Sequence, residues 1–297
     1  MPEARKLTEA TTAYRGTLTK PENWAGFQPR EGDVLLITPA KSGTTWTQSM
    51  IAMLLYGTAE LPDRLGALSP WIDGGFGTLD DYLADLARQS GRRVIKTHTP
   101  ADGVPMWQDV AVVSSFRHPL EVFLSIRKHL ANAKSIDEHP LLAPIDQSLP
   151  VFLQGTFDKD DIDKDALSVI VRHFEQMVLT PHVPHKLVLN YAQMKRDHRG
   201  TVDRLDAFLG TGASPELRAE ITEATSFGAM KTRAADFAPE ANNDLWHDDK
   251  AFFAGGQSGH WRASFTDDQI AAYDAAFAAL LPDPGHRAWI ETGEGDV

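Results

Sequence analysis

Residues 34–37 read Val34-Leu35-Leu36-Ile37, and residues 41–46 read Lys41-Ser42-Gly43-Thr44-Thr45-Trp46. The first run is short and wholly apolar, which predicts a buried strand, and the second predicts a loop that opens a helix. The loop offers a cation, a glycine, several hydroxyls and backbone N–H groups that the helix does not use. These groups together bind phosphate-like anions. The stretch therefore predicts an α/β fold with an anion site at the end of a buried strand.

The spacing of this loop distinguishes it from a Walker A loop. A Walker A loop places four residues between its first glycine and a Gly-Lys-Ser/Thr sequence. Here Lys41 precedes Gly43, which is the one glycine of residues 39–46. The loop is therefore a relative of the kinase P-loop with a shifted lysine.

Composition restricts the classes of function. The chain has 297 residues, a formal net charge of −12 and no cysteine. Such an acidic chain is poorly suited to nucleic acid or to an anionic membrane surface, and the lack of cysteine excludes disulfides and thiolate catalysis. Residues 1–20 lack the apolar core of a signal peptide, and no apolar stretch approaches the length of a membrane span. We therefore expect a cytoplasmic protein with no nucleic-acid partner and no membrane span.

Further apolar runs predict three more strands, and amphipathic segments alternate with them. The predicted strands are residues 34–37, 93–96, 110–115 and 187–189. A helix is expected from Trp46 to a stop at Gly57, and another from Pro119 through Leu130. Short strands that are apolar on both faces indicate a central parallel sheet with helices on both faces. Ligands of such sheets bind at the carboxyl ends of the strands.

Residues 1–297 are expected to form a single domain. No Pro/Gly/Ser-rich linker divides the chain, and single α/β domains of this size are common. The charge-dense segment 158–165 is interpreted as an exposed loop and not as a domain boundary.

The segment Pro39–Trp46 resembles the 5′-phosphosulfate loop of the cytosolic-type sulfotransferases, and the resemblance extends over about residues 27–266, with the character of a bacterial member. These enzymes use 3′-phosphoadenosine 5′-phosphosulfate (PAPS) and release 3′-phosphoadenosine 5′-phosphate (PAP). The resemblance implies a P-loop-like sulfotransferase fold. It also implies in-line transfer of a sulfonyl group to a hydroxyl, or an amine, of a small-molecule acceptor, with no metal ion.

Lys96-Thr97-His98 follows the second predicted strand and resembles the Lys-Thr-His motif of the family. Sulfonyl transfer needs a base for the acceptor's proton and cations for the oxygens that gain charge. The resemblance makes His98 the base, Lys41 the cation at the leaving oxygen and Lys96 the contact to the sulfonyl group. A loop histidine that serves only local hydrogen bonds is the alternative for His98.

Two further clusters resemble nucleotide contacts of the family. Arg117 and Ser125 have the spacing of its 3′-phosphate site, which suits the forked donors of an arginine. In Thr225-Ser226-Phe227-Gly228-Ala229-Met230-Lys231 the resemblance makes Phe227 and Trp46 the two faces around adenine, with Thr225 beside it. Tyr191 resembles the adenine-contacting tyrosine. Core packing is the alternative for Phe227 and Trp46, and surface exposure for Tyr191. With these residues, the donor site would comprise Lys41, Ser42, Gly43, Thr44, Thr45, Trp46, Arg117, Ser125, Tyr191, Thr225 and Phe227.

A fifth segment departs from the family pattern. Where the family has Arg-Lys-Gly over the 3′-phosphate, this chain has Ala254, Gly255 and Gly256. Backbone N–H groups of Gly255 and Gly256 are expected to form an anion nest in place of the lost side chains, with Lys250 or Arg233 as possible substitutes. The family's dimerisation motif is not preserved either, so a homo-oligomer stays an open alternative.

The acceptor is not identified by the sequence. Its walls are expected from segments 59–89, 131–163 and 239–253. Candidate contacts are Trp71, Phe76, Phe152 and Trp246, with His129, His173 and Phe174 nearby. Two other functions remain as alternatives: a nucleotide kinase or NTPase with an atypical P-loop, and a non-catalytic protein that binds PAP or another nucleotide.

Overall fold

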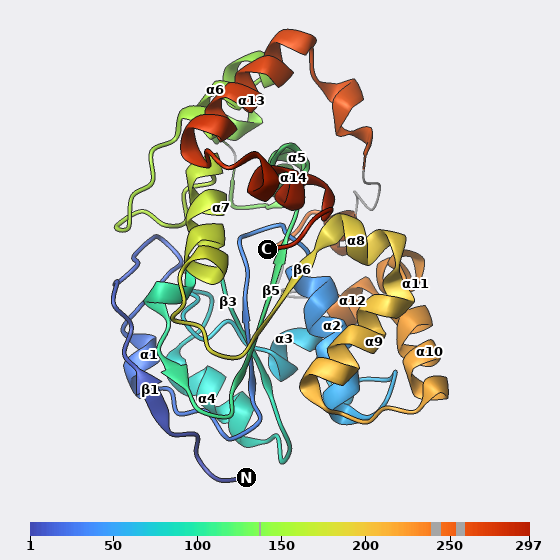
Figure 1. The fold of residues 1–297 in the computed structure, drawn as a ribbon. Helices are drawn as coiled ribbons and strands as arrows, with labels where there is room; N and C mark the ends of the chain where they lie inside the picture. The colour runs from blue at the N-terminus through green and yellow to red at the C-terminus, as the bar shows by residue number, and fades with distance from the viewer. Residues whose placement is uncertain (137, 239–244, 254–258) are drawn as a thin grey trace.

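Four parallel strands form the central sheet of the computed structural model, which describes residues 1–136, 138–238, 245–253 and 259–297. Their order is β3-β2-β5-β6 (Figure 1). The strands are β2 Val34–Ile37, β3 Val94–Thr97, β5 Ala111–Phe116 and β6 Lys186–Asn190. All their pairings are parallel. The predicted parallel sheet is confirmed, with β3 and β5 each one residue further along the chain than expected.

Alternate residues of the strands serve two different cores. Leu35 and Ile37 of β2 belong to a cluster on one face of the sheet, while Val34 and Leu36 belong to a cluster on the other. Successive side chains of a strand point to opposite faces. Because both faces are buried, each position of the strand must be apolar, which explains the uninterrupted apolar run.

Helices cover both faces of the sheet, as predicted (Figure 1). One core includes residues of α2 Thr44–Tyr56, α3 Leu65–Leu68, α8 Tyr191–Arg196, α9 His198–Leu209, α10 Pro215–Ala224, α11 Phe227–Thr232 and α12 Ala234–Phe237. The other includes residues of α1 Asn23–Gly26, α4 Leu79–Ala87, α5 Pro119–Asn132, α6 Ile145–Gln154, α7 Leu167–Phe174, α13 Asp267–Leu280 and α14 Pro284–Thr292. Within the described residues, no helix has both the length and the apolar character needed to cross a bilayer.

The remaining elements are short. An antiparallel pair, β1 Lys6–Thr8 with β4 Met106–Trp107, lies outside the main sheet and was not predicted. The one-turn elements are η1 Ala101–Gly103, η2 Pro140–Leu142, η3 Glu175–Leu179, η4 Asp249–Phe253 and η5 His260–Ser264.

Helix α2 begins and ends at glycines in the left-handed region. Gly43 precedes the helix with φ at 102°, and Gly57 follows it with φ at 67°. Only glycine adopts such values without steric cost. The predicted helix stop at Gly57 is confirmed.

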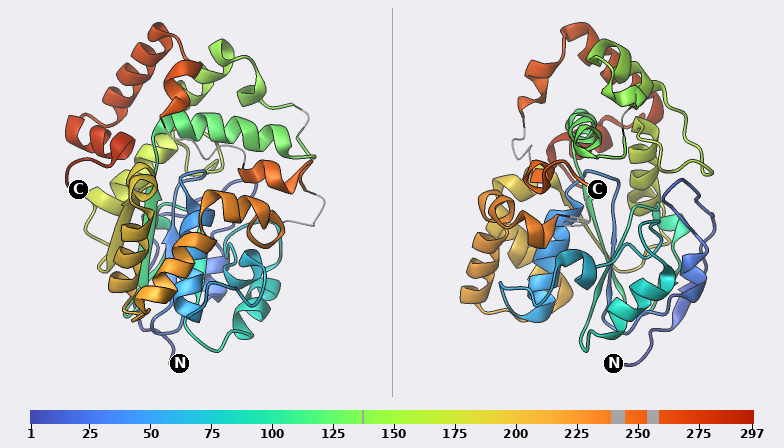
Figure 2. Two further views of the ribbon diagram at one scale, coloured as in Figure 1. Left: turned by 90° about the vertical axis from the view of Figure 1, so that its right-hand side faces the viewer. Right: turned by 180° about the vertical axis from the view of Figure 1, so that it is seen from behind.

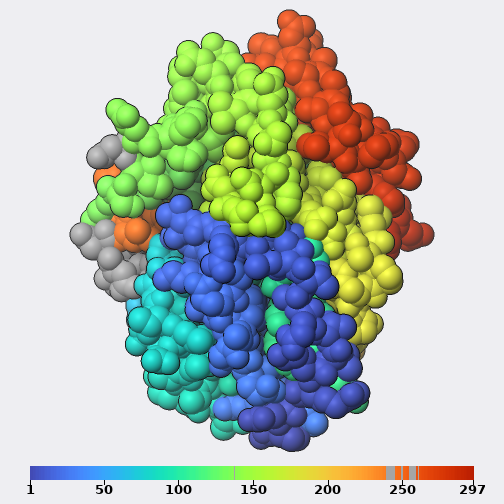
Figure 3. All heavy atoms as spheres, turned by 90° about the vertical axis from the view of Figure 1, so that its left-hand side faces the viewer, coloured from blue at the N-terminus to red at the C-terminus, as the bar shows by residue number. Residues whose placement is uncertain are grey.

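Helix α5 extends across the carboxyl ends of the strands (Figure 2). The segment from residue 245 to 253 is fastened to its last turn: Asn132 Nδ2 donates to the carbonyl of Asp248 at 2.9 Å, and Ala133 forms a bridge with Trp246. On another side, the blue N-terminal segment lies directly below the yellow-green region of α7 in Figure 3. Helix α5 and these two segments enclose the space above the strand ends.

Candidate active site

A cavity of about 730 Å³ lies at the carboxyl ends of the strands. Residues that follow β2, β3, β5 and β6 all line it, including Lys41, His98, Arg117 and Tyr191. Parallel strands bring their carboxyl ends to one edge of the sheet. Residues separated by up to 150 positions along the chain therefore meet in one place, as the sequence predicted.

The loop after β2 has two residues in the left-handed region, Lys41 with φ at 59° and Gly43 with φ at 102°. A Cβ atom at Gly43 would lie only 2.9 Å from Cδ2 of Tyr191, so the loop packs tightly against the residue after β6. The hydroxyls of Thr38 and Thr44 are hydrogen-bonded to each other at 2.7 Å and tie the strand end to the first turn of α2. These contacts hold the loop in one conformation, and its backbone N–H groups lie at the N-terminus of α2.

His98 has a defined tautomer. Its Nδ1 lies 2.8 Å from the carbonyl oxygen of Thr38, and a carbonyl only accepts, so Nδ1 carries the proton. Nε2 of the neutral ring is then free to accept a proton. Burial lowers the pKa of His98 well below its usual value, and the nearby charge of Lys96 lowers it further. The ring is therefore neutral at physiological pH, which a general base requires.

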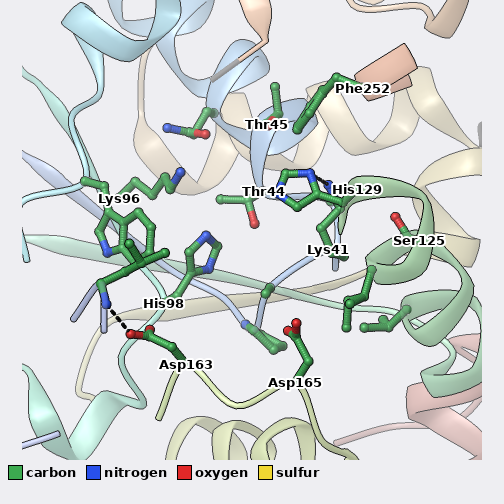
Figure 4. Close-up of a pocket in the computed structure, with 18 of the residues that line it drawn as sticks. Lys41, Thr44, Thr45, Lys96, His98, Ser125, His129, Asp163, Asp165 and Phe252 are labelled. Carbon is green, nitrogen blue, oxygen red and sulfur yellow. Dashed lines mark hydrogen bonds between the residues drawn. The ribbon is translucent and has the colours of Figure 1, made fainter. Parts of the chain in front are cut away.

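Lys41 and Lys96 lie on either side of His98 (Figure 4). The Lys96 ammonium sits 5.0 Å from the ring centre of Trp71, and the Lys41 ammonium 4.3 Å from that of Phe252. Burial, with repulsion from Arg117 and Lys96, lowers the pKa of Lys41 to about 7. The site thus places several cations close together in a buried environment, where the charged forms are unfavourable. A bound anion would stabilise the charged forms.

Lys41 also contacts His129, whose Nδ1 lies 3.1 Å from its Nζ. When Lys41 is charged, its ammonium only donates, and Nδ1 of His129 then accepts. Burial, together with the charge of Lys41, lowers the pKa of His129 well below its usual value, which keeps the ring neutral. His129 follows Ser125 by one turn of α5, and both line the cavity.

Arg117 is held by two neighbours. Its Nε donates to Glu121 Oε2 at 2.9 Å, and its guanidinium lies 4.4 Å from the ring centre of Tyr191. The other oxygen of Glu121 accepts from the backbone N–H of Gly259 at 2.6 Å. Ser125 lies on α5, one turn after Glu121, and lines the cavity with Arg117. The role of Arg117 and Ser125 at a 3′-phosphate stays a prediction. Glu121 is a partner of Arg117 that the sequence did not indicate.

Trp46 and Phe227 both line the cavity. The indole N–H of Trp46 donates to the carbonyl of Thr225 at 2.8 Å, and the ring packs edge-on against Tyr191 and His198. Phe227 is 44% exposed, which argues against the alternative that it packs in the core. Thr225 is fully buried, and its hydroxyl donates to the carbonyl of Ile221 at 2.6 Å.

The acceptor candidates divide into those inside the cavity and one outside it. The candidates that line the cavity are Trp71, Phe76, Phe152, Trp246, His129 and His173. Phe174, also named as a candidate, instead packs in the core against Phe116 and Trp289. Helical periodicity explains the difference, because His173 and Phe174 are consecutive and point to different sides of α7.

The interpretation of segment 158–165 as an exposed loop is wrong at its end. Asp163 and Asp165 line the cavity (Figure 4). Asp163 is bound to the N-terminal segment through Leu18 and Thr19, which fastens this part of the loop inward. A run of charged residues predicts that a segment is partly exposed to solvent. It does not predict which of its residues line a cavity.

Gly255 and Gly256 lie outside the described residues, so their predicted nest stays a prediction. Neither Arg233 nor Lys250 lines the cavity; Arg233 is paired with Asp236 at 2.9 Å. Lys195 does line the cavity and adds a cation near Arg117. Its position on α8, one turn after Tyr191, is the pattern that could have revealed it.

The fold and the site define a class of protein with a parallel α/β sheet, a P-loop-like turn and a neutral histidine between two lysines. A family model of the sulfotransferase domain matches residues 31–285, so the chain belongs to the sulfotransferase domain family and is a sulfotransferase. The predicted family and enzyme class are confirmed. The kinase alternative has no support from this match.

Relatives extend over almost the whole chain. A glycolipid sulfotransferase of Mycobacterium bovis (strain BCG / Pasteur 1173P2) is 27% identical, with 94% of this chain and 94% of that protein aligned. Sulfotransferase 1A1 of Canis lupus familiaris is 28% identical over 89% of this chain and 88% of its own. The structure of mouse sulfotransferase SULT7A1 complexed with PAP has a TM-score of 0.69 at 20% identity and covers 95% of this chain and 96% of its own. The predicted sulfotransferase fold is thereby confirmed.

Proposed function

We propose that this sulfotransferase moves the sulfonyl group of PAPS to a hydroxyl of an apolar acceptor, with His98 as the general base. The observation that carries the proposal is the hydrogen bond from His98 Nδ1 to the Thr38 carbonyl at 2.8 Å. It leaves Nε2 as the proton acceptor in a cavity that Lys41 and Lys96 also line. A base beside two cations is what transfer of an anionic group requires.

The residues present fit the proposed donor. The tight cradle at Gly43, where a side chain would collide with Tyr191, suits close approach of a phosphate to the backbone. Arg117 and Ser125 are assigned to the 3′-phosphate, and Trp46, Phe227 and Thr225 to the adenosine, with Tyr191 beside them. Ser42, Thr44 and Thr45 complete the phosphosulfate loop. No group of three metal-ligating side chains occurs among the residues that the structure describes.

The proposed chemistry assigns one task to each group. When bound, PAPS supplies a sulfonyl group on a phosphate leaving group. His98 Nε2 removes the proton from the acceptor's oxygen as that oxygen bonds to sulfur. Lys41 donates to the oxygen between sulfur and phosphorus as that bond breaks, and Lys96 donates to the sulfonyl oxygens. The products are a sulfate ester, PAP and a protonated His98, which returns its proton to water.

The acceptor is assigned to the apolar side of the cavity. Trp71, Phe76, Phe152 and Trp246 line the cavity and suit the body of a hydrophobic molecule, and Trp71 packs edge-on against His98 at 4.9 Å between ring centres. The relatives named as glycolipid sulfotransferases favour a glycolipid, which combines apolar chains with sugar hydroxyls. A cytoplasmic enzyme of one domain stays our expectation, and its oligomeric state stays open, with a homo-oligomer as one alternative.

The test combines turnover and binding. Labelled PAPS is supplied with a panel of phenols, aliphatic alcohols and glycolipids, and PAP binding is measured by calorimetry. His98→Ala should retain PAP affinity and lose turnover by at least about a hundredfold, as expected for a general base. Lys41→Ala should weaken both.

Three results would contradict the proposal. One is full turnover in His98→Ala, and another is binding of ATP with Mg²⁺ in preference to PAP. The third is a wild-type chain that binds PAPS and modifies no acceptor, which would favour the non-catalytic alternative.

A further inference from the structure

The acceptor side of the cavity is largely apolar. The apolar residues that line the cavity include Leu18, Trp71, Phe152, Ile162, Ile170 and Trp246. They come from the N-terminal segment, from the loops near β3 and before α7, from α6 and α7, and from the segment beside α5. Apolar walls hold a ligand but do not orient it, so the few polar groups among them decide which acceptor hydroxyl reaches His98.

Two of these polar groups are already used by the fold. Asp163 accepts the N–H groups of Leu18 and Thr19 at 2.6 and 3.0 Å, and the hydroxyl of Thr19 at 2.7 Å. His173 donates from Nε2 to the carbonyl of His98 at 2.9 Å. Both side chains use their polar atoms in hydrogen bonds between chain segments, so few of these atoms can bind a ligand.

Asp165 differs from them. Among the described residues its carboxylate makes no hydrogen bond and no ion pair within 4.0 Å, although it lines the cavity. In Figure 4 its carboxylate points into the cavity toward Lys41, and His98 faces the same cavity. Burial raises the pKa of Asp165 to about 7, against the opposing effect of the Lys41 charge. Asp165 is half-buried, and its carboxylate meets the cavity without a donor from the described part of the chain, so a ligand in the cavity can supply that donor.

We propose that Asp165 determines acceptor specificity by accepting a hydrogen bond from a second hydroxyl of the acceptor, adjacent to the hydroxyl that reacts at His98. The inference rests on the proposed function. It narrows the acceptor class to apolar molecules that carry a vicinal diol, such as the sugar of a glycolipid.

The charges near Asp165 favour a neutral hydroxyl over an ammonium group. Lys41 is close enough to perturb the titration of Asp165, and Lys96 is on the other side of His98. An acceptor ammonium between them would meet two like charges. A hydroxyl satisfies the carboxylate without that repulsion.

Three acceptors with the same long alkyl chain test the proposal: a vicinal diol, the alcohol with a single hydroxyl, and the corresponding amino alcohol. The ratio of kcat/KM values is measured with labelled PAPS. The wild type should prefer the diol over the single alcohol by roughly tenfold or more, as for a hydrogen bond to a charged group. Asp165→Asn keeps an acceptor oxygen but loses its charge, so it should lower this ratio several-fold, and Asp165→Ala should bring it close to one. A ratio within one protein is independent of the folded fraction.

Asp161→Asn is the matched control, because Asp161 is exposed on the same loop and the change removes the same charge. It should keep the wild-type ratio. A wild type without preference, an Asp165→Ala enzyme that retains it, or preference for the amino alcohol would each overturn the inference. Absence of product from all three acceptors would contradict the proposed function itself.

Discussion

Gly43 begins α2 with φ at 102°, and a Cβ there would lie 2.9 Å from the Tyr191 ring. Gly43→Ala therefore combines backbone strain with a collision inside the proposed donor site. Strain of this kind costs about 1–3 kcal/mol. We expect PAP affinity, measured by calorimetry, to fall by roughly tenfold or more.

Gly57→Ala is the control for this change. Gly57 also has a positive φ, 67°, but no atom lies within 4 Å of a Cβ built there. The variant should lose about 1 kcal/mol of unfolding free energy and keep its PAP affinity. Equal PAP affinity in both alanine variants would refute the role of the cradle at Gly43.

Lys41 gives PAP binding a pH dependence with a defined sign. Burial, with repulsion from Arg117 and Lys96, lowers the pKa of Lys41 to about 7, so the side chain is mostly neutral at pH 8. A bound anion favours the ammonium form, and binding must therefore take up a proton. We expect PAP affinity to weaken as pH rises from 7 to 9, by up to about tenfold per unit.

Calorimetry in two buffers of different ionisation enthalpy measures this proton uptake directly. Asp165 also titrates near neutrality, since burial raises its pKa to about 7. Asp165→Asn should retain most of the uptake, and Lys41→Gln should remove it. Uptake that persists in Lys41→Gln would show that another group is responsible.

At the scale of elements, a buried ion pair joins β2 and β3 at the edge of the sheet opposite the cavity. Asp33 is fully buried, Arg93 nearly so, and their closest atoms are 2.5 Å apart. Removing one partner of a buried pair costs about 3–5 kcal/mol, because the other charge remains buried. Asp33→Asn should therefore lower the unfolding free energy by about 3 kcal/mol or more in denaturant titrations.

The exposed pair Lys6 and Glu9 provides the comparison, with 3.2 Å between its charged atoms. Glu9→Gln should change stability by less than about 1 kcal/mol. Folded Asp33→Asn should bind PAP normally, since Asp33 lies at the opposite ends of the strands. A large loss of PAP affinity would contradict this separation of stability from function.

The elements that carry the site were predictable because local chemistry specifies them. A short run that is apolar at every position is typical of an inner strand buried on both faces. The cation, glycine and hydroxyls that follow it are typical of an anion-binding loop. His98 and Arg117 followed from their positions at strand ends, where a parallel sheet gathers side chains.

Contacts between distant segments were not predictable in the same way. Glu121 and His129 lie one helical turn after Arg117 and Ser125, but α5 has other polar residues, and periodicity does not say which meets a loop lysine. The loop that carries Asp165 is joined at Asp163 to the N-terminal segment, more than 140 positions away. The pair β1–β4 is too short for a periodic pattern.

For the whole molecule, the two cores share one sheet. Strand β2 contributes Leu35 and Ile37 to one cluster and Val34 and Leu36 to the other, so neither core can lose its packing alone. We therefore expect a single unfolding transition in calorimetry. PAP at a hundred times its dissociation constant should stabilise the whole fold by about 2.7 kcal/mol. Two transitions, with only one shifted by PAP, would contradict a single domain.

The hydrogen bond from Trp46 to the carbonyl of Thr225 spans 179 positions of the chain. One wall of the proposed adenosine pocket is thus synthesised early and the other, at Phe227, only after about three quarters of the polypeptide has been made. A nascent chain on the ribosome gains its phosphate loop long before it can hold a nucleoside. The chain can therefore bind PAPS only late in translation. Truncated products should not compete with the full-length enzyme for PAPS.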